Sequence, residues 1–347
     1  MTIDRKSAGA LGLLGVGFKL WYALLIDTPR LAGSFSVTLL AGAAGFLPAL
    51  WAFHLLERQR PGVEPDELLR LAGGTRGRQA YYLLLSAFLL VSAALSASEL
   101  INVASYIALS NQSQDWLNLA TVASLCLCAL CGGRAVAGCS RVRLCYLPVI
   151  WAIIVLVQYR SFVPRWLLPP LADSAGAIAR EAVSLSGVYM LLVPVWLLSG
   201  SCRAAAVTFV KATALVLCAS LLFGMLAPVM PFAQHTRFFR LDTLLSNGRT
   251  SLSLQLPHMI VIYTGLLTGG CFGLSMAARL LNRCFPAVRE KWFVLGGAAC
   301  VLGLLYTGAT AQENAWLLRS AFWPLILLPL WVMALAGALR KRGRAHA

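Results

Sequence analysis

Long apolar runs alternate with short polar segments along the whole chain. The runs predict ten membrane-spanning helices, at residues 8–27, 35–56, 80–109, 116–132, 144–159, 184–200, 205–228, 254–281, 292–309 and 316–338. A helix of about 20 apolar residues crosses the roughly 30 Å of hydrocarbon in a bilayer. The pattern therefore predicts an all-α, polytopic membrane protein that forms a single integral membrane domain over residues 1–347.

The composition also predicts a membrane protein. Of the 347 residues, 59% are hydrophobic and only 12% are charged, which leaves too little polar surface to cover a water-soluble globule. The net charge of +16 is spread over short loops. Its expected partners are therefore the headgroups of membrane lipids, and no nucleic-acid partner is expected.

The distribution of Lys and Arg predicts the orientation in the membrane. These residues concentrate in alternate loops; Arg143 is counted with the inner loops and Arg319 with the outer ones. Because cytoplasmic loops carry the excess of positive charge, both termini are expected in the cytoplasm. An even number of spans agrees with this.

The ten spans divide into two sets of five, residues 1–159 and residues 184–338. Since five is an odd number, the two sets run in opposite directions through the bilayer, as in an inverted repeat. Transporters built this way place their sites at interrupted helices in matching positions of the two halves. We therefore predict that helices one and six are broken and form the site.

Helix one carries two glycines and a charge near its middle. Gly15 and Gly17 weaken the helix locally, and Lys19 lies about 17 Å into it at 1.5 Å per residue. Trp21 and Tyr22 follow on the same helix. An ammonium in hydrocarbon is costly, which predicts a polar cavity at this point.

Glu99, in the third span, is the second clear charge inside a span. Charges in membranes usually pair with each other or with backbone carbonyls. A Lys19–Glu99 ion pair is one interpretation, and separate partners for the two residues are the other.

Polar residues of helices six and eight complete the set of candidates for ligand binding. In helix six they are Ser186, Gly187 and Tyr189, and in helix eight they are Tyr263, Thr264 and Thr268. Thr264 and Thr268 share one helix face, although threonines in membrane helices often bond only their own preceding carbonyls.

No catalytic motif accompanies these residues. The chain lacks a nucleophile elbow, a zinc-protease motif and a phosphate-binding loop, and its four histidines are scattered. Its ten cysteines lie mostly in apolar runs, where free cysteine behaves as a small hydrophobe. We therefore expect neither an enzyme, nor a metal site, nor a cofactor.

Several short motifs resemble the B subunit of bacterial spore germinant receptors, the endospore germination permease family of the amino acid–polyamine–organocation superfamily. They are Gly17 with Pro29-Arg30 and Leu31-Ala32-Gly33, Ser98-Glu99-Leu100-Ile101, Ser186-Gly187-Val188-Tyr189 with Pro194, and Arg240-Leu241-Asp242. The total length and the layout of the spans fit as well.

The resemblance implies a sensor of a small nutrient in the spore inner membrane or the bacterial cell membrane. It also implies an A-type subunit with soluble domains and a C-type lipoprotein subunit as partners. The pocket carried over by position uses Gly15, Gly17, Lys19, Ser186, Gly187 and Glu99.

Two departures bear on the ligand. Trp21-Tyr22 stands where relatives often keep a pair of small residues, and Tyr189 stands where they often have an acidic residue. Lys19 supplies a fixed cation, which favours an anionic or uncharged ligand. Two other functions stay open: a secondary transporter of amino acids or related small solutes, and a structural subunit of a membrane complex.

Overall fold

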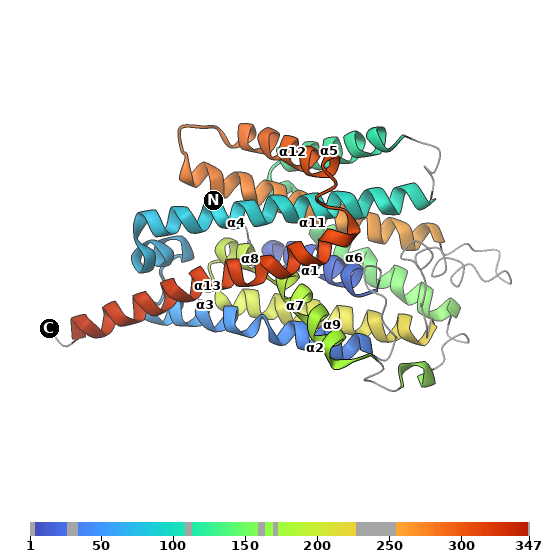
Figure 1. Cartoon of the computed structure of the whole chain (residues 1–347), viewed down its shortest axis with the longest axis horizontal. Helices are drawn as coiled ribbons and strands as arrows, with labels where there is room; N and C mark the ends of the chain where they lie inside the picture. Colours follow the sequence, from blue (N-terminus) through green and yellow to red (C-terminus); the bar gives the residue numbers. More distant parts are fainter. Residues whose placement is uncertain are drawn as a thin grey trace.

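The computed structural model describes residues 4–25, 34–107, 113–158, 164–168, 173–226 and 255–345, and the regular elements within these ranges are helices. Most of the helices run along the long axis of the molecule (Figure 1). In chain order they are α1 (Arg5–Leu25), α2 (Phe35–Ala44), α3 (Leu47–Gln59), α4 (Pro65–Ile107), α5 (Gln114–Leu130), α6 (Gly133–Gln158), the 3₁₀ helix η3 (Pro164–Leu167), α7 (Ala175–Tyr189), α8 (Leu192–Ser199), α9 (Cys202–Leu226), α11 (Gln255–Cys284), α12 (Glu290–Tyr306) and α13 (Gln312–Ala345).

Each of the ten predicted spans overlaps a helix or a pair of consecutive helices. Among the described residues, seven spans are long and apolar enough to cross a bilayer, or eight if α5 and α6, bent by 105°, count as one. The remaining predicted span is α12, which has 17 residues and packs beside α5 (Figure 1). The chain is a polytopic, all-α membrane protein.

Helix one differs from the prediction. α1 runs without interruption from Arg5 to Leu25, so the expected break at Gly15 and Gly17 is wrong. A Cβ on Gly15 would lie 3.5 Å from the Cα of Gly269 in α11. This glycine lets two helix backbones approach each other closely, a usual role of small residues between membrane helices.

Helix six is interrupted, as predicted. α7 ends at Tyr189 and α8 begins at Leu192, and the turn between them closes through hydrogen bonds of the short i→i+3 type. Pro194 lies in the first turn of α8, where the missing N–H is tolerated. Within the apolar windows of α1 and of α7–α8, 89% of the residues are buried, compared with 28% in α13. Helices one and six are therefore central.

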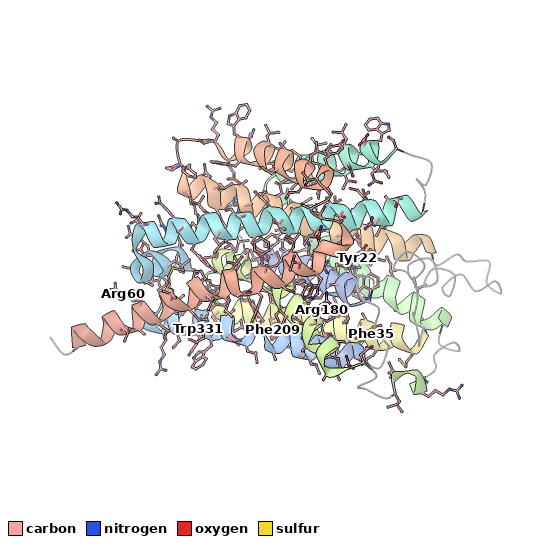
Figure 2. The ribbon with its side chains drawn as sticks, viewed as in Figure 1. Tyr22, Phe35, Arg60, Arg180, Phe209 and Trp331 are labelled. Carbon is pink, nitrogen blue, oxygen red and sulfur yellow. The ribbon has the colours of Figure 1, made fainter. Side chains whose placement is uncertain are left out.

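The second span is also interrupted, which the sequence pattern did not indicate. α2 ends at Ala44, and α3 begins at Leu47 with Pro48 in its first turn. Phe35 at the start of α2 and Arg60 after α3 lie toward opposite ends of the bundle (Figure 2), so the two helices together cross it.

α4 begins with a short arm that changes direction at Gly74, whose φ of 73° favours glycine. The arm is fixed by Asp66. Its carboxylate accepts hydrogen bonds from Arg78, at 3.1 Å, and from Tyr82 of the same helix. It also pairs with Arg283 at the end of α11, at 3.3 Å. Arg240-Leu241-Asp242 and the rest of that outer loop lie outside the described residues.

The backbones of α7 and α13 meet at Gly187. A Cβ on this residue would lie 1.9 Å from the carbonyl oxygen of Arg319, a clash that only a shift of one helix relieves. We expect Gly187→Ala to lower the stability by roughly 1–3 kcal/mol, the usual cost of overpacking. Equilibrium unfolding in mixed micelles measures this change.

Gly296→Ala is the matched control, because its added methyl group meets no atom within 4 Å among the described residues and α12 is helical there. An equal loss of stability in both variants would contradict the close contact between α7 and α13.

Candidate functional site

Among the described residues four charged side chains are buried: Glu181 of α7, which is 8% exposed, and three others on three further helices. Lys19 of α1 and Glu99 of α4 are 4% exposed, and Arg319 of α13 is 6% exposed. Away from water, a charge is stable only if other groups of the protein take over its hydration. The contacts of these three residues therefore define the site.

Glu99 forms an ion pair with Arg319, at 2.8 Å between Oε1 and Nη2. Arg319 is not a loop residue, as the orientation count assumed; it lies in the first part of α13. The signal in the sequence was its position inside an apolar run, between Leu318 and Ser320. An arginine near the end of a span commonly reaches the membrane surface with its long side chain, whereas Arg319 pairs inside the bundle.

Lys19 donates a hydrogen bond from Nζ to the carbonyl oxygen of Ser92, at 2.5 Å. The same carbonyl accepts a bond from Ser96 Oγ, at 3.1 Å. Ser92 and Glu99 are seven residues apart on α4, so they share one face two turns apart. One stripe of α4 therefore supplies acceptors for cations from two other helices. The Lys19–Glu99 ion pair stays a prediction.

A small chamber of about 20 Å³ lies between these helices. Its wall contains Lys19 and Ser92 on one part, Arg319 on another, and Gly187 and Leu191 at the interruption between α7 and α8. A cavity of this size holds about one water molecule. With two cations and one carboxylate among the three charged residues, their net charge is positive.

The other candidates of helices one and six have structural contacts. Ser186 Oγ donates to the carbonyls of Gly42 and Ala182, at 3.0 and 2.7 Å, and so joins α7 to α2. The Tyr189 hydroxyl lies 2.8 Å from Thr213 Oγ1, and its ring stacks on Phe46.

Of the remaining residues of α1, Tyr22 is buried (Figure 2), and Gly17 and Trp21 line a separate pocket that faces α6 and α9. Gly15 contacts α11. Of the predicted ligand-binding residues that the structure describes, Lys19 and Gly187 line the chamber, and Glu99 is connected to it through its ion pair with Arg319.

The predicted residues of the eighth span, which is α11 in the structure, lie away from the chamber. They lie next to Arg143, an arginine that the sequence analysis placed in a loop. Arg143 of α6 donates to the Thr264 carbonyl at 3.0 Å and to Thr268 Oγ1. Both threonine hydroxyls also donate to preceding carbonyls of their own helix, as threonines in membrane helices often do. Tyr263 is half-buried near them. Arg143 therefore links α6 to α11 inside the bundle.

Comparison with known proteins identifies a fold. No family model matches the chain, and no curated protein matches it. A solved structure of MHP1, a nucleobase-cation-symport-1 family transporter in a closed conformation with bromovinylhydantoin bound, is similar with a TM-score of 0.59 and 14% identity. The match covers 88% of this chain and 72% of that one. The chain has a transporter-type fold.

The Glu99–Arg319 ion pair gives a testable prediction. Arg319→Met leaves the buried carboxylate without its guanidinium, and we expect a loss of about 3–5 kcal/mol, as for other buried pairs that lose one partner. Adding Glu99→Gln to this variant should recover part of the loss, because it removes the unpaired charge. Equilibrium unfolding of both variants and of Glu99→Gln alone completes the cycle.

Arg70→Met is the control, since it breaks the exposed Arg70–Glu67 pair, at 2.6 Å, and exposed pairs contribute little. Additive losses for Arg319→Met and Glu99→Gln would show that the two residues do not stabilise each other.

Proposed function

We propose that this chain is a secondary transporter of a small solute and that the chamber is its substrate site. The observation that carries the proposal is the set of buried charges, Lys19, Glu99 and Arg319, beside the interruption of helix six in a transporter-type fold. Charges inside membrane proteins usually mark the path of a substrate or an ion.

The interrupted helix supports the same site. Leu191, in the turn between α7 and α8, lines the chamber together with Gly187 and Val188. The turn between the two helices keeps short i→i+3 hydrogen bonds, and a stretch of this kind within a longer span often marks a functional hinge. The chamber is too small for a solute as described, so a substrate enters only after the helices around it separate.

The charges favour a substrate with a carboxylate group. Arg319 presents a planar set of donors that suits a carboxylate, and Lys19 adds a second cation. Glu99 already occupies part of this donor set, so a substrate carboxylate competes with it for Arg319. A substrate that carries only an amine meets two like charges and is disfavoured. Amino acids and other small carboxylates are the solutes that fit best.

A sensory role is the second candidate, and the germinant-receptor motifs around Gly17, Glu99 and Gly187 support it. In that case the chamber binds a nutrient and signals to A-type and C-type subunits without transport. The close contact at Gly187 is compatible with this candidate, because a ligand that moves α7 at the chamber would also move α13. A structural subunit of a membrane complex would need no ligand.

Uptake by proteoliposomes distinguishes these functions. We expect saturable uptake of a radiolabelled amino acid or small carboxylate, with competition by carboxylates and little competition by amines. Lys19→Met should reduce the initial rate at least about tenfold, the change expected from about 1.4 kcal/mol of lost binding free energy. Lys291→Met, at an exposed position of α12, should leave the rate unchanged.

A second measurement separates transport from sensing. A ligand that binds only the native state raises the apparent melting temperature. A ligand-dependent rise without uptake would favour the receptor. If no amino acid or small carboxylate gave either a rise in melting temperature or uptake, the role of a structural subunit would be favoured.

A further inference from the structure

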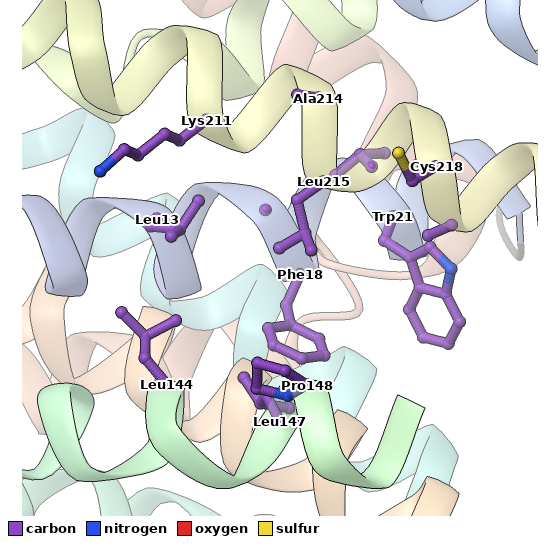
Figure 3. Close-up of a pocket in the computed structure, with 13 residues that line it drawn as sticks. Leu13, Phe18, Trp21, Leu144, Leu147, Pro148, Lys211, Ala214, Leu215 and Cys218 are labelled. Carbon is purple, nitrogen blue, oxygen red and sulfur yellow. The ribbon is translucent and has the colours of Figure 1, made fainter. Parts of the chain in front are cut away.

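A large apolar pocket lies on the side of α1 that faces away from the chamber. Its volume is about 570 Å³, which is within the range of small-molecule sites. Figure 3 shows it between α9, α1 and α6, with Lys211 at one end and Trp21 at the other. Phe18, Leu147 and Leu215 contribute apolar surface between these two ends.

A second pocket, of about 460 Å³, continues from the first. Leu13, Leu144 and Lys211 line both pockets, so the two form one cleft. The second pocket is basic: besides Lys211, it is lined by Arg5, Lys6 and Arg203. All four cationic side chains are exposed. Among the described residues, neither pocket is lined by Asp or Glu.

The cleft changes from basic to apolar along the direction of the membrane normal. α1 and α9 run parallel, because Gly9 faces Thr208 and Gly17 faces Leu215. Arg5 and Lys6 begin α1, and Arg203 lies in the first turn of α9, so these cations lie at one end of the spans. Lys211 is about 12 Å further along α9 than Arg203 at 1.5 Å per residue, and its long side chain can reach back toward that end.

We propose that this cleft binds an anionic phospholipid, with the phosphate among Arg5, Lys6, Arg203 and Lys211 and an acyl chain in the apolar pocket. Basic pockets between membrane helices are typical sites for anionic headgroups. A free phosphate would use the cations alone and leave the apolar pocket unused. The proposal is independent of the proposed transport function, since none of these residues lines the chamber.

The site would act on α1, one of the two most buried spans among the described residues. Gly17 and Phe18 line the lipid cleft, and the neighbouring Lys19 lines the chamber. A lipid in the cleft therefore supports α1 from the side opposite to α4. Lipid binding should stabilise the protein whether or not a solute is present.

The test compares two lipids with identical acyl chains. Purified protein is placed in mixed micelles with phosphatidylglycerol or phosphatidylcholine, and the apparent melting temperature and the lipid retained in native mass spectrometry are measured. We expect phosphatidylglycerol to raise the melting temperature more and to be retained. Arg203→Gln combined with Lys211→Gln should remove at least half of this difference. Arg289→Gln combined with Lys291→Gln, which removes the same charge at exposed positions at the start of α12, should preserve it.

A second pair of variants tests whether an acyl chain occupies the apolar pocket. Ala214→Phe fills the pocket and should abolish retention, whereas Val210→Phe, on the exposed face of the same helix and outside both pockets, should not. Equal rises with the two lipids would overturn the proposal, as would equal losses in the variant pairs. An equal rise with inorganic phosphate in place of the lipid would show a phosphate site and overturn it as well.

Discussion

Within a bilayer no bulk water surrounds the buried charges, so the protein itself must supply their solvation. Helix α4 supplies partners for both buried cations. The Ser92 carbonyl accepts a hydrogen bond from Lys19, and the Glu99 carboxylate pairs with Arg319. The relative positions of α1, α4 and α13 depend on these two contacts. The first contact joins α1 to α4, and the second joins α13 to α4.

The small residues determine how closely the remaining helices approach this core. Gly15 brings α1 against α11, and Gly187 brings α7 against the backbone of α13 at Arg319. The second contact has a double effect, since it also places the interruption between α7 and α8 beside the guanidinium. The position of the chamber thus follows from one ion pair and one glycine contact.

The sequence predicts the class, the spans and the interruption of helix six, because apolar run length and the Ser186-Gly187 and Pro194 pattern are local properties. It does not predict the continuity of helix one. Glycine permits a break or a close contact equally well, and Gly269, far along the chain, decides which occurs. Arg319 and Arg143 were misplaced for a related reason: near the end of a span, an arginine can reach either the surface or the core, and only the partner helix decides. Lys19 and Glu99 can be identified from the sequence because each lies inside a predicted span, Lys19 near its middle and Glu99 nearer its outer end.

The arm at the start of α4 differs from the core in how it is attached. Asp66, Arg78 and Arg283 form their ion pairs at positions that water reaches, with 29%, 18% and 45% of the side chains exposed. Counter-ions screen such pairs, whereas they do not enter the dry interior around Glu99. Ionic strength therefore acts selectively on this molecule: raising it loosens the hold of the arm on α11 and leaves the electrostatics of the centre unchanged.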